Sequence, residues 1–247
     1  RRAQRLRRDT LPPMSEPDDP SRKEARIVEA RMRLRERFEA RQAATPARAD
    51  LSPEGTGPAN RHGMPRLPPG QHEVTGWPVL DLGTKPVVSK DVFRLQLTGA
   101  CDHPQSLDWK ALMAMPIVED TSDFHCVTTW SRYDMRWRGV RFAELAALAG
   151  VHDDAEHVLC HAYDGYTTNL PLVEALKDDV LIAFEVDGQP LSREHGGPAR
   201  MITLQLYAWK GAKWISKIEF RVHDRKGFWE EHGYSNSAHP WREDRYS

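Results

Sequence analysis

Three short segments of this chain carry most of the side chains that could do chemistry. The first is the run 123–131, where histidine, threonine, serine and tryptophan residues cluster around the thiol of Cys126. The second runs from His195 to Arg200 through a Gly-Gly-Pro turn, and the third ends near Lys213. One thiolate with separate cationic and backbone donors suits a soft metal whose organic ligand carries a phosphate. These segments therefore predict a cofactor site assembled from distant parts of the chain.

Each segment also has a purely structural interpretation. An isolated cysteine flanked by Phe124 and Val127 is usually a small buried hydrophobic residue, but the polar neighbours of Cys126 could stabilise a thiolate. The planar guanidinium of Arg200 offers paired donors to a phosphate, and the two glycines before it let backbone approach a ligand closely. Taken alone, however, the Gly-Gly-Pro run is typical of a tight turn, and Lys213 of a solvated lysine beside core tryptophans.

The elements that must position these residues form a mixed pattern. We expect short helices over 107–115 and 142–148, and strands over 92–97, 157–163, 180–186 and 215–222. Gly150 is a natural C-terminal cap for the second helix, and Asp187-Gly188 predicts a hairpin after the third strand. Strands and helices do not alternate regularly, which excludes a doubly wound dinucleotide-binding domain. The sequence therefore predicts the α+β class.

The N-terminal part of the chain differs in composition from the rest. Residues 1–50 contain 14 Lys and Arg against 9 Asp and Glu, whereas residues 51–247 contain 21 against 27. A capping-box pattern at Ser21-Arg22-Lys23-Glu24 predicts an amphipathic, solvated helix. This helix is either an arm that binds a partner or nucleic acid, or an exposed helix that lies against the domain or stays mobile. Residues 43–70 are rich in Pro, Gly and Ala, which indicates an extended linker. We therefore place the helix and linker in 1–66 and the globular domain in 67–247.

Composition excludes several classes of protein. The net charge is −1, and the folded part is mildly acidic, which argues against nucleic-acid binding. The three cysteines are too few and too far apart for a disulfide framework or a zinc knuckle, so we expect a reducing compartment. No apolar run is long enough to span a membrane, and Arg7-Arg8 is not followed by the apolar segment of an export signal. We expect a cytoplasmic monomer.

Taken together, the three segments resemble the sulfite oxidase-like molybdopterin oxidoreductases. His125-Cys126, Trp130-Ser131 and Trp137-x-Gly139-Val140 are similar to the segment that carries the molybdenum ligand, above all in the bacterial branch with the methionine sulfoxide reductase catalytic subunit. The resemblance covers roughly residues 72–247. It implies a sulfite oxidase-type α+β fold of mixed sheets with short helices and a bound molybdenum–molybdopterin (a molybdenum–pyranopterin). It also implies that Cys126 is the metal ligand and the catalytic residue.

The resemblance further assigns the residues that hold the cofactor. Relatives use a His or Asn with an Arg five residues later, and a Gly-x-Lys element. They also use a contact near residues 161–169 and the backbone of a segment near residue 80. The matching positions in this sequence are His195, Arg200, Gly211, Ala212, Lys213, His161, Asp164, Leu80 and Asp81. The run 205–208 lacks the proline usual in relatives, which leaves the path of that segment into the site open.

The function that the resemblance implies is two-electron oxygen-atom transfer on a small sulfur-containing substrate of the sulfite or sulfoxide type. We expect electrons to pass to a separate electron-transfer partner, because no haem-binding segment precedes the core. The residues leave two alternatives open. A cysteine hydrolase could pair Cys126 with His125, His161 or His195, since such a pair needs only proximity in the fold. A non-enzymatic scaffold would act through the basic N-terminal helix.

Overall fold

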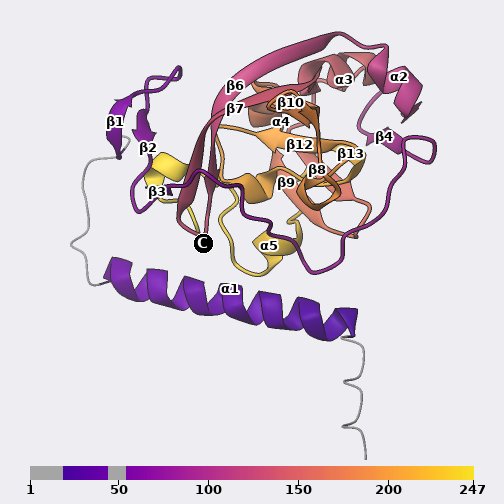
Figure 1. The fold of residues 1–247 in the computed structure, drawn as a ribbon. Coiled ribbons are helices and arrows are strands. Elements are labelled where there is room, and N and C mark those ends of the chain that lie inside the picture. Colours follow the sequence, from indigo (N-terminus) through magenta and orange to yellow (C-terminus); the bar gives the residue numbers. More distant parts are fainter. Residues whose placement is uncertain (1–18, 44–53) are drawn as a thin grey trace, which may run out of the picture.

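The structure of the protein, a computed structural model, describes residues 19–43 and 54–247 (Figure 1). The helices of these ranges are α1 (Pro20–Ala43), α2 (Trp109–Met113), α3 (Phe142–Ala149), α4 (Leu172–Ala175), α5 (Phe228–Glu231) and the 3-10 turns η1 (Arg193–His195), η2 (Ala208–Lys210) and η3 (Pro240–Arg242). The strands are β1 (Thr56–Ala59), β2 (Pro65–Leu67), β3 (His72–Glu73), β4 (Arg94–Gly99), β5 (Gln105–Asp108), β6 (Ile117–Cys126), β7 (Trp130–Arg141), β8 (His157–Ala162), β9 (Thr167–Pro171), β10 (Val180–Val186), β11 (Gln189–Pro190), β12 (Arg200–Thr203) and β13 (Ile215–Arg221).

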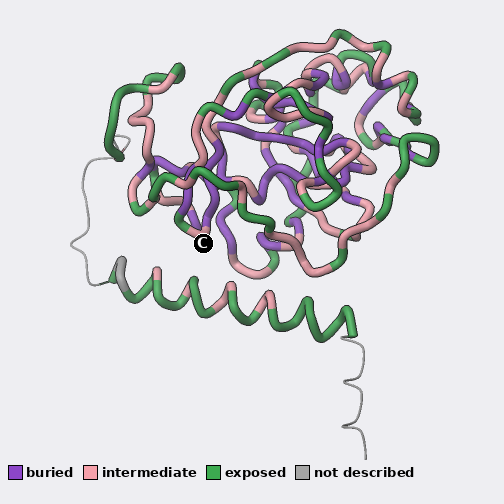
Figure 2. The backbone as a smooth tube through the Cα atoms, in the orientation of Figure 1, coloured by how far each residue is buried: buried purple, intermediate pink, exposed green. Residues whose placement is uncertain are grey.

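Two mixed sheets build the domain. One contains β11, β10, β7 and β3 in that order, with β12 beside β10 and β6 beside β7. The other has the order β5-β4-β13-β8-β9. Buried side chains from both sheets, such as Leu95, Ile182 and Ile218, belong to one hydrophobic cluster, and the buried backbone fills the middle of the domain (Figure 2). This arrangement confirms the α+β class.

Several predicted elements are confirmed in detail. Helix α3 ends at Gly150, whose left-handed conformation (φ 60°, ψ 60°) lets its N–H cap the last turn. Asp187 and Gly188 both have positive φ, as a two-residue hairpin between β10 and β11 requires. The helix expected over 107–115 begins later, at Trp109, because Asp108 ends β5 and its carboxylate accepts a hydrogen bond from the N–H of Ala111.

The extended linker predicted over 43–70 is wrong for the part that the structure describes. Strands β1 and β2 pair as an antiparallel hairpin, with Thr56 opposite Leu67. The Trp241 indole N–H donates to the carbonyl of Pro65 at 2.5 Å, and the N–H of Glu54 donates to the carbonyl of Trp241. The hairpin is thus tied to the C-terminal segment. The division of the chain at residue 66 stays a prediction.

Helix α1 lies along one side of the domain (Figure 1). Lys23 donates from Nζ to the carbonyl of Gly83 at 3.1 Å, and the Arg35 guanidinium donates to the carbonyls of His232 and Ser247 at 3.4 and 3.3 Å. The predicted helix is confirmed, and of its expected dispositions the structure has the one against the domain. No helix in the described ranges is both long and apolar enough to cross a membrane.

Candidate functional site

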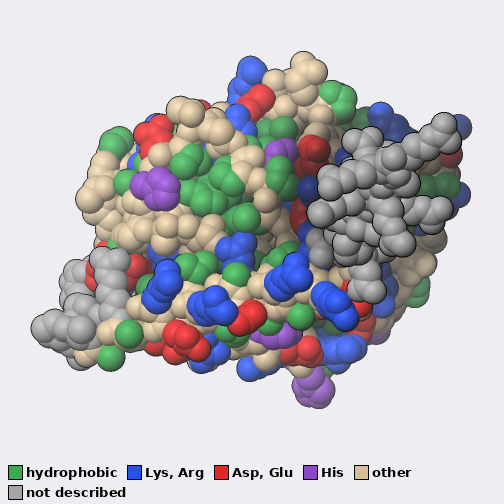
Figure 3. Space-filling view, turned by 60° about the horizontal axis from the view of Figure 1, so that its bottom comes forward, with side chains coloured by type: hydrophobic (Ala, Val, Ile, Leu, Met, Phe, Trp, Pro, Cys, Tyr) green, Lys and Arg blue, Asp and Glu red, His purple; other side chains and the backbone are tan. Residues whose placement is uncertain are grey.

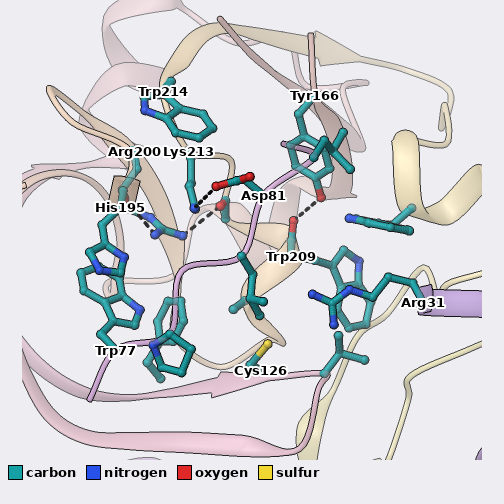
Figure 4. Close-up of a pocket in the computed structure, with 18 of the residues that line it drawn as sticks. Arg31, Trp77, Asp81, Cys126, Tyr166, His195, Arg200, Trp209, Lys213 and Trp214 are labelled. Carbon is teal, nitrogen blue, oxygen red and sulfur yellow. Dashed lines mark hydrogen bonds and ion pairs between the residues drawn. The ribbon is translucent and has the colours of Figure 1, made fainter. Parts of the chain in front are cut away.

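One pocket collects side chains from all three chemically active segments (Figure 4). Cys126 comes from the end of β6, His195 from η1, Arg200 from the start of β12 and Lys213 from the loop after η2. The predicted site residues that line this pocket are Cys126, His195, Arg200, Gly211, Lys213, Asp164, Leu80 and Asp81. The fold therefore brings eight of the ten predicted positions to one place, although they are far apart in the sequence.

Cys126 sits at a tight turn between two paired strands. The N–H of Thr129 donates to the Cys126 carbonyl at 3.1 Å, and Thr129 takes a positive φ of 79°, which turns the chain from β6 into β7. The thiol is buried, and its Sγ lies 3.1 Å from the hydroxyl oxygen of Thr128. Burial raises the pKa of this thiol, whereas the hydrogen bonds from Thr128 and the charges of Arg31 and Arg245 lower it. The Thr128 hydrogen bonds and the two arginine charges therefore favour the thiolate form of Cys126 when a metal ion binds its sulfur.

The opposite end of the pocket is cationic. Arg200 is 3% exposed, and its Nη1 and Nη2 donate to the carbonyls of His195 and Gly211 at 3.1 and 3.2 Å. No carboxylate among the described residues pairs with it, and burial lowers its pKa to about 10. Lys213 donates to the Glu194 carbonyl at 2.7 Å and lies 3.9 Å from the Asp81 carboxylate. Burial and then the charge of Arg200 lower the pKa of Lys213 to about 7.

His195 is held flat against a tryptophan. Its ring stacks on Trp77 with centroids 3.7 Å apart and an interplanar angle of 2°. Burial, followed by the charges of Arg200 and Lys213, lowers the pKa of His195 to about 4, so the imidazole is neutral near pH 7. Trp77 belongs to no helix or strand, and nothing in its local sequence marks it as part of a site.

Glycines let the two cationic segments pack closely. Gly196 has a φ of 103°, and a Cβ on it would lie 3.0 Å from the Cβ atoms of both Arg200 and Lys213. A Cβ on Gly211 would lie 2.6 Å from the carbonyl oxygen of Met201. The sequence suggested that glycines here admit a ligand. In the structure they also admit the neighbouring chain, and this brings the guanidinium and the ammonium to the same wall of the pocket.

Aromatic side chains outside the ten predicted site residues form much of the rest of the wall. The Tyr166 hydroxyl donates to the carbonyl of Trp209 at 2.6 Å, and the Trp209 indole N–H donates to Glu230 at 2.9 Å. Trp229 follows from α5, and Tyr234 stacks on it with ring centroids 4.9 Å apart. Their spacing in the sequence fits ordinary core positions equally well, so only the folded chain reveals that they surround Cys126.

Two predicted contact residues lie outside the pocket lining. Ala212 is fully buried, and its carbonyl accepts a hydrogen bond from the N–H of Met201 at 2.9 Å. His161 lies on β8 of the five-stranded sheet, where its Nε2 is 3.2 Å from the Glu219 carboxylate. The strand that carries His161 turns this ring away from the pocket, whereas Asp164, after the strand, does reach it.

His125, the neighbour of Cys126, also points elsewhere. Successive side chains on a strand face opposite sides, and the His125 ring packs on Trp241 with centroids 5.2 Å apart. Its Nδ1 lies 2.8 Å from the Ser131 hydroxyl, in the wall of a second pocket under the β1–β2 hairpin. The structure therefore does not pair this imidazole with the Cys126 thiol.

The donor set fits a metal that arrives on an organic phosphate. The Arg200 guanidinium is buried without a carboxylate partner in the described part of the chain, and it shares a wall of the pocket with the largely buried Lys213 ammonium. This leaves positive charge that an anion would neutralise. Cys126 offers a single soft ligand to this pocket, and the described residues hold no group of three or more His, Cys, Asp or Glu able to bind a bare ion. The protein side chains thus offer one metal ligand, Cys126, and two cations that could bind a phosphate. This donor set matches the predicted cofactor.

Comparison with known proteins agrees with this chemistry. The family model described as the oxidoreductase molybdopterin binding domain matches residues 82–229. An uncharacterized oxidoreductase of Bacillus subtilis, YuiH, is 42% identical over 74% of this chain and 92% of its own length. A putative protein-methionine-sulfoxide reductase subunit of Azospira oryzae, YedZ1, is 28% identical over 58% of this chain. The mitochondrial sulfite oxidase of Drosophila melanogaster is 30% identical over 40% of this chain.

The match to the longer relatives is partial. This chain spans 54% of the length of YedZ1 and 19% of the length of the sulfite oxidase. Among solved structures, the sulfane dehydrogenase SoxCD of Paracoccus pantotrophus matches with a TM-score of 0.55 and 20% identity, over 64% of this chain and 47% of that one. At this identity the likeness concerns the fold, and it confirms the predicted fold class.

Proposed function

Since this chain belongs to the family with the oxidoreductase molybdopterin binding domain, we propose that the pocket around Cys126 holds its molybdenum–molybdopterin and transfers an oxygen atom to or from a small sulfur compound. Membership confirms the resemblance found in the sequence, and it makes the chain a molybdopterin-dependent oxidoreductase. One observation supports this location of the site above all others. The buried Arg200, which pairs with no carboxylate among the described residues, and the largely buried Lys213, whose Nζ is 3.9 Å from the Asp81 carboxylate, share a pocket with the Cys126 thiol.

Each wall of the pocket takes a separate task in this proposal. Cys126 binds the metal, and Arg200 and Lys213 bind the phosphate of the cofactor through charge-assisted hydrogen bonds. His195, neutral and fixed by its stacking on Trp77, contacts the pterin. The residues that complete the cofactor site are Gly211, Asp164, Leu80 and Asp81. Ala212 and His161 line no part of the pocket and are left out of this set.

When bound, the cofactor supplies a metal centre that exchanges two electrons together with an oxygen atom. The protein holds and orients it. The indole and phenol rings around Cys126 exclude water from the metal end, which strengthens electrostatic interactions there. Thr128 and the nearby arginines stabilise the thiolate form of Cys126. Electrons leave for a separate carrier protein, and the substrate is a small sulfur compound of the sulfite or sulfoxide type.

The geometry does not favour a cysteine hydrolase. The hydrogen-bond partner of the Cys126 Sγ is the Thr128 hydroxyl. His125 and His161 lie outside the pocket lining. His195 lines the pocket, but a pKa of about 4 makes its imidazole a weak base near pH 7. No candidate base is therefore both placed and tuned for thiol activation. The scaffold alternative is excluded by membership in an enzyme family.

The test is metal and pterin analysis of protein produced in a host that makes molybdopterin. We expect about one molybdenum per chain, since Cys126 is the one cysteine in the pocket lining. Cys126→Ser should abolish oxygen-atom transfer to or from sulfite and sulfoxides in assays with artificial electron carriers. Cys160→Ser is the matched control, because Cys160 is also buried but its sulfur contacts the Met201 sulfur instead. Molybdenum-free protein, or full activity in Cys126→Ser, would refute the proposal.

A further inference from the structure

Helix α1 contributes a side chain, Arg31, to the wall of the cofactor pocket, although the helix precedes the residues that match the family model. Lys23, Ile27, Arg31 and Arg35 recur every fourth residue and therefore share one face of the helix. Ile27 packs against the hydrophobic core, and Arg31 is part of the pocket wall. The sequence predicted a helix unconnected with the cofactor motifs. In the structure its inner face belongs to the site.

Both ends of this inner face are anchored. Lys23 Nζ binds the carbonyl of Gly83, in the loop whose Leu80 and Asp81 line the pocket. Three turns later, Arg35 binds the carbonyl of His232, between the pocket residues Trp229 and Tyr234. The helix is thus bound to two separate segments that contribute to the pocket lining, and Arg31 lies between the two anchors along the helix.

Arg31 differs from both anchors in having no polar partner in the described part of the chain. Among the described residues it makes no hydrogen bond and no ion pair, and its side chain is half-buried. Figure 4 shows the side chain extending from α1 into the pocket, on the other side of Cys126 from Arg200. Its positive charge acts on Cys126 and Tyr234, whereas the charge of Arg200 acts on His195 and Lys213.

The pocket therefore has two separate sources of positive charge. Arg200 and Lys213 lie at the end where we place the phosphate of the cofactor. Arg31 lies near Cys126, at the end where we place the metal. An arginine that is partly desolvated and lacks an internal partner binds an anion strongly, and its planar donors suit oxygen atoms. A row of Lys and Arg side chains also follows α1 on the surface, below an area of hydrophobic side chains (Figure 3).

We propose that α1 is a strap across the mouth of the cofactor pocket and that Arg31 binds the oxygen atoms of an anionic substrate at the metal end. The inference rests on the proposed function, because it assumes that the cofactor fills the end near Arg200. It narrows the substrate class to small sulfur oxyanions in preference to neutral sulfoxides. Arg31 is in this sense a specificity-determining residue outside the family-matched segment.

The test uses the full-length holoenzyme, in which the cofactor phosphate occupies the other cationic end. Arg31→Gln is compared with Arg33→Gln, a control with the same loss of charge. Arg33 lies on the same helix, but it pairs with Glu29 and its side chain is 66% exposed. Inorganic sulfate serves as an inert oxyanion, and its dissociation constant is measured from the fluorescence of the pocket tryptophans. The KM and kcat for sulfite and for dimethyl sulfoxide are measured in parallel.

We expect Arg31→Gln to weaken sulfate binding and to raise the KM for sulfite by about 10-fold or more, with little change in kcat. The KM for dimethyl sulfoxide and the molybdenum content should stay as in the wild type. Arg31→Lys should recover part of the affinity because it keeps the charge, and Arg33→Gln should match the wild type. Hydrogen exchange of α1 should be the same in Arg31→Gln and Arg33→Gln.

Several outcomes would overturn the inference. Equal sulfate binding by Arg31→Gln and Arg33→Gln, or no binding by the wild type, would show that Arg31 holds no oxyanion. Faster exchange of α1 in Arg31→Gln alone would show that the residue anchors the helix instead. Either result with molybdenum still bound refutes the strap proposal and leaves the proposed function intact. Protein without molybdenum in the wild type refutes the proposed function first.

Discussion

Lys210 and Lys213, three residues apart, show two different uses of a buried ammonium group. Lys210 has no exposed side-chain surface, and its Nζ lies 2.7 Å from the Glu230 carboxylate and 2.8 Å from the carbonyl of Asn169. Lys213 turns into the pocket, where the nearest carboxylate in the described ranges, that of Asp81, is 3.9 Å away. The first charge is neutralised within the fold. The second is left for a ligand.

The difference shows that the partner of a buried charge is more informative than its pKa. Burial lowers the pKa of both lysines. Glu230 counteracts this effect at Lys210, whereas Arg200 strengthens it at Lys213. A lowered pKa alone would mark both residues as functional. The presence of a close carboxylate separates the structural lysine from the one that we expect to bind phosphate.

The largest effect should come from breaking the compensated pair. Lys210→Met leaves the Glu230 carboxylate buried without its cation, which should reduce the free energy of unfolding by about 3–5 kcal/mol. Urea denaturation followed by circular dichroism measures this loss. In the double variant Lys210→Met/Glu230→Gln the buried charge is gone, and we expect much of the stability to return. A single variant as stable as the wild type would contradict the structural role of the pair.

An intermediate effect should come from the uncompensated cations. Arg200→Met and Lys213→Met each remove charge-assisted hydrogen bonds to the phosphate, worth about 1.5–3 kcal/mol of cofactor binding. The cofactor-free protein should stay folded, because Arg200 pairs with no carboxylate among the described residues, and Asp81, the carboxylate beside Lys213, also lies 3.8 Å from the Lys85 ammonium. Molybdenum and pterin content after gel filtration measures retention. Full occupancy in the double variant would show that the phosphate binds elsewhere.

The sequence predicted the parts of the site that rest on local motifs. Cys126, Arg200 and Lys213 stand in short runs whose residue types suit the chemistry, and the fold brings these runs together. The Asp187-Gly188 pair also predicted the hairpin between β10 and β11, because few residue types adopt the positive φ that such a turn requires. These features depend on neighbouring residues and are therefore visible in the sequence.

Contacts between distant segments were not predictable in the same way. Trp77 stacks on His195 across more than a hundred residues, and only the packing of both segments brings the rings together. The period of α1 indicated an exposed helix, but not that Arg31 would enter the pocket. His161 lies outside the pocket because strand pairing orients its side chain toward Glu219. Strand register and tertiary packing decide such contacts, and neither can be predicted from one short run of sequence.

The third effect concerns the pH dependence of stability in the cofactor-free protein. The pKa of Lys213 falls from 10.5 to about 7 on folding, so between these values the unfolded chain binds more protons at this residue than the folded chain. Below pH 7 the folded protein bears the full free-energy cost of burying the charged amine. This cost falls as the pH rises toward 10.5, so the free energy of unfolding increases over this range. Lys213→Met should therefore be more stable than the wild type at pH 6, and its advantage should shrink with rising pH. The slope cannot exceed about 1.4 kcal/mol per pH unit for one proton.

Urea denaturation at several pH values measures this slope, with a Lys110→Met variant at an exposed position as control. In the holoenzyme the phosphate should raise the pKa of Lys213 and abolish the slope. A cofactor-free protein in which wild type and Lys213→Met run parallel from pH 6 to 10 would show that Lys213 is solvated, and the contrast with Lys210 would then reduce to burial alone.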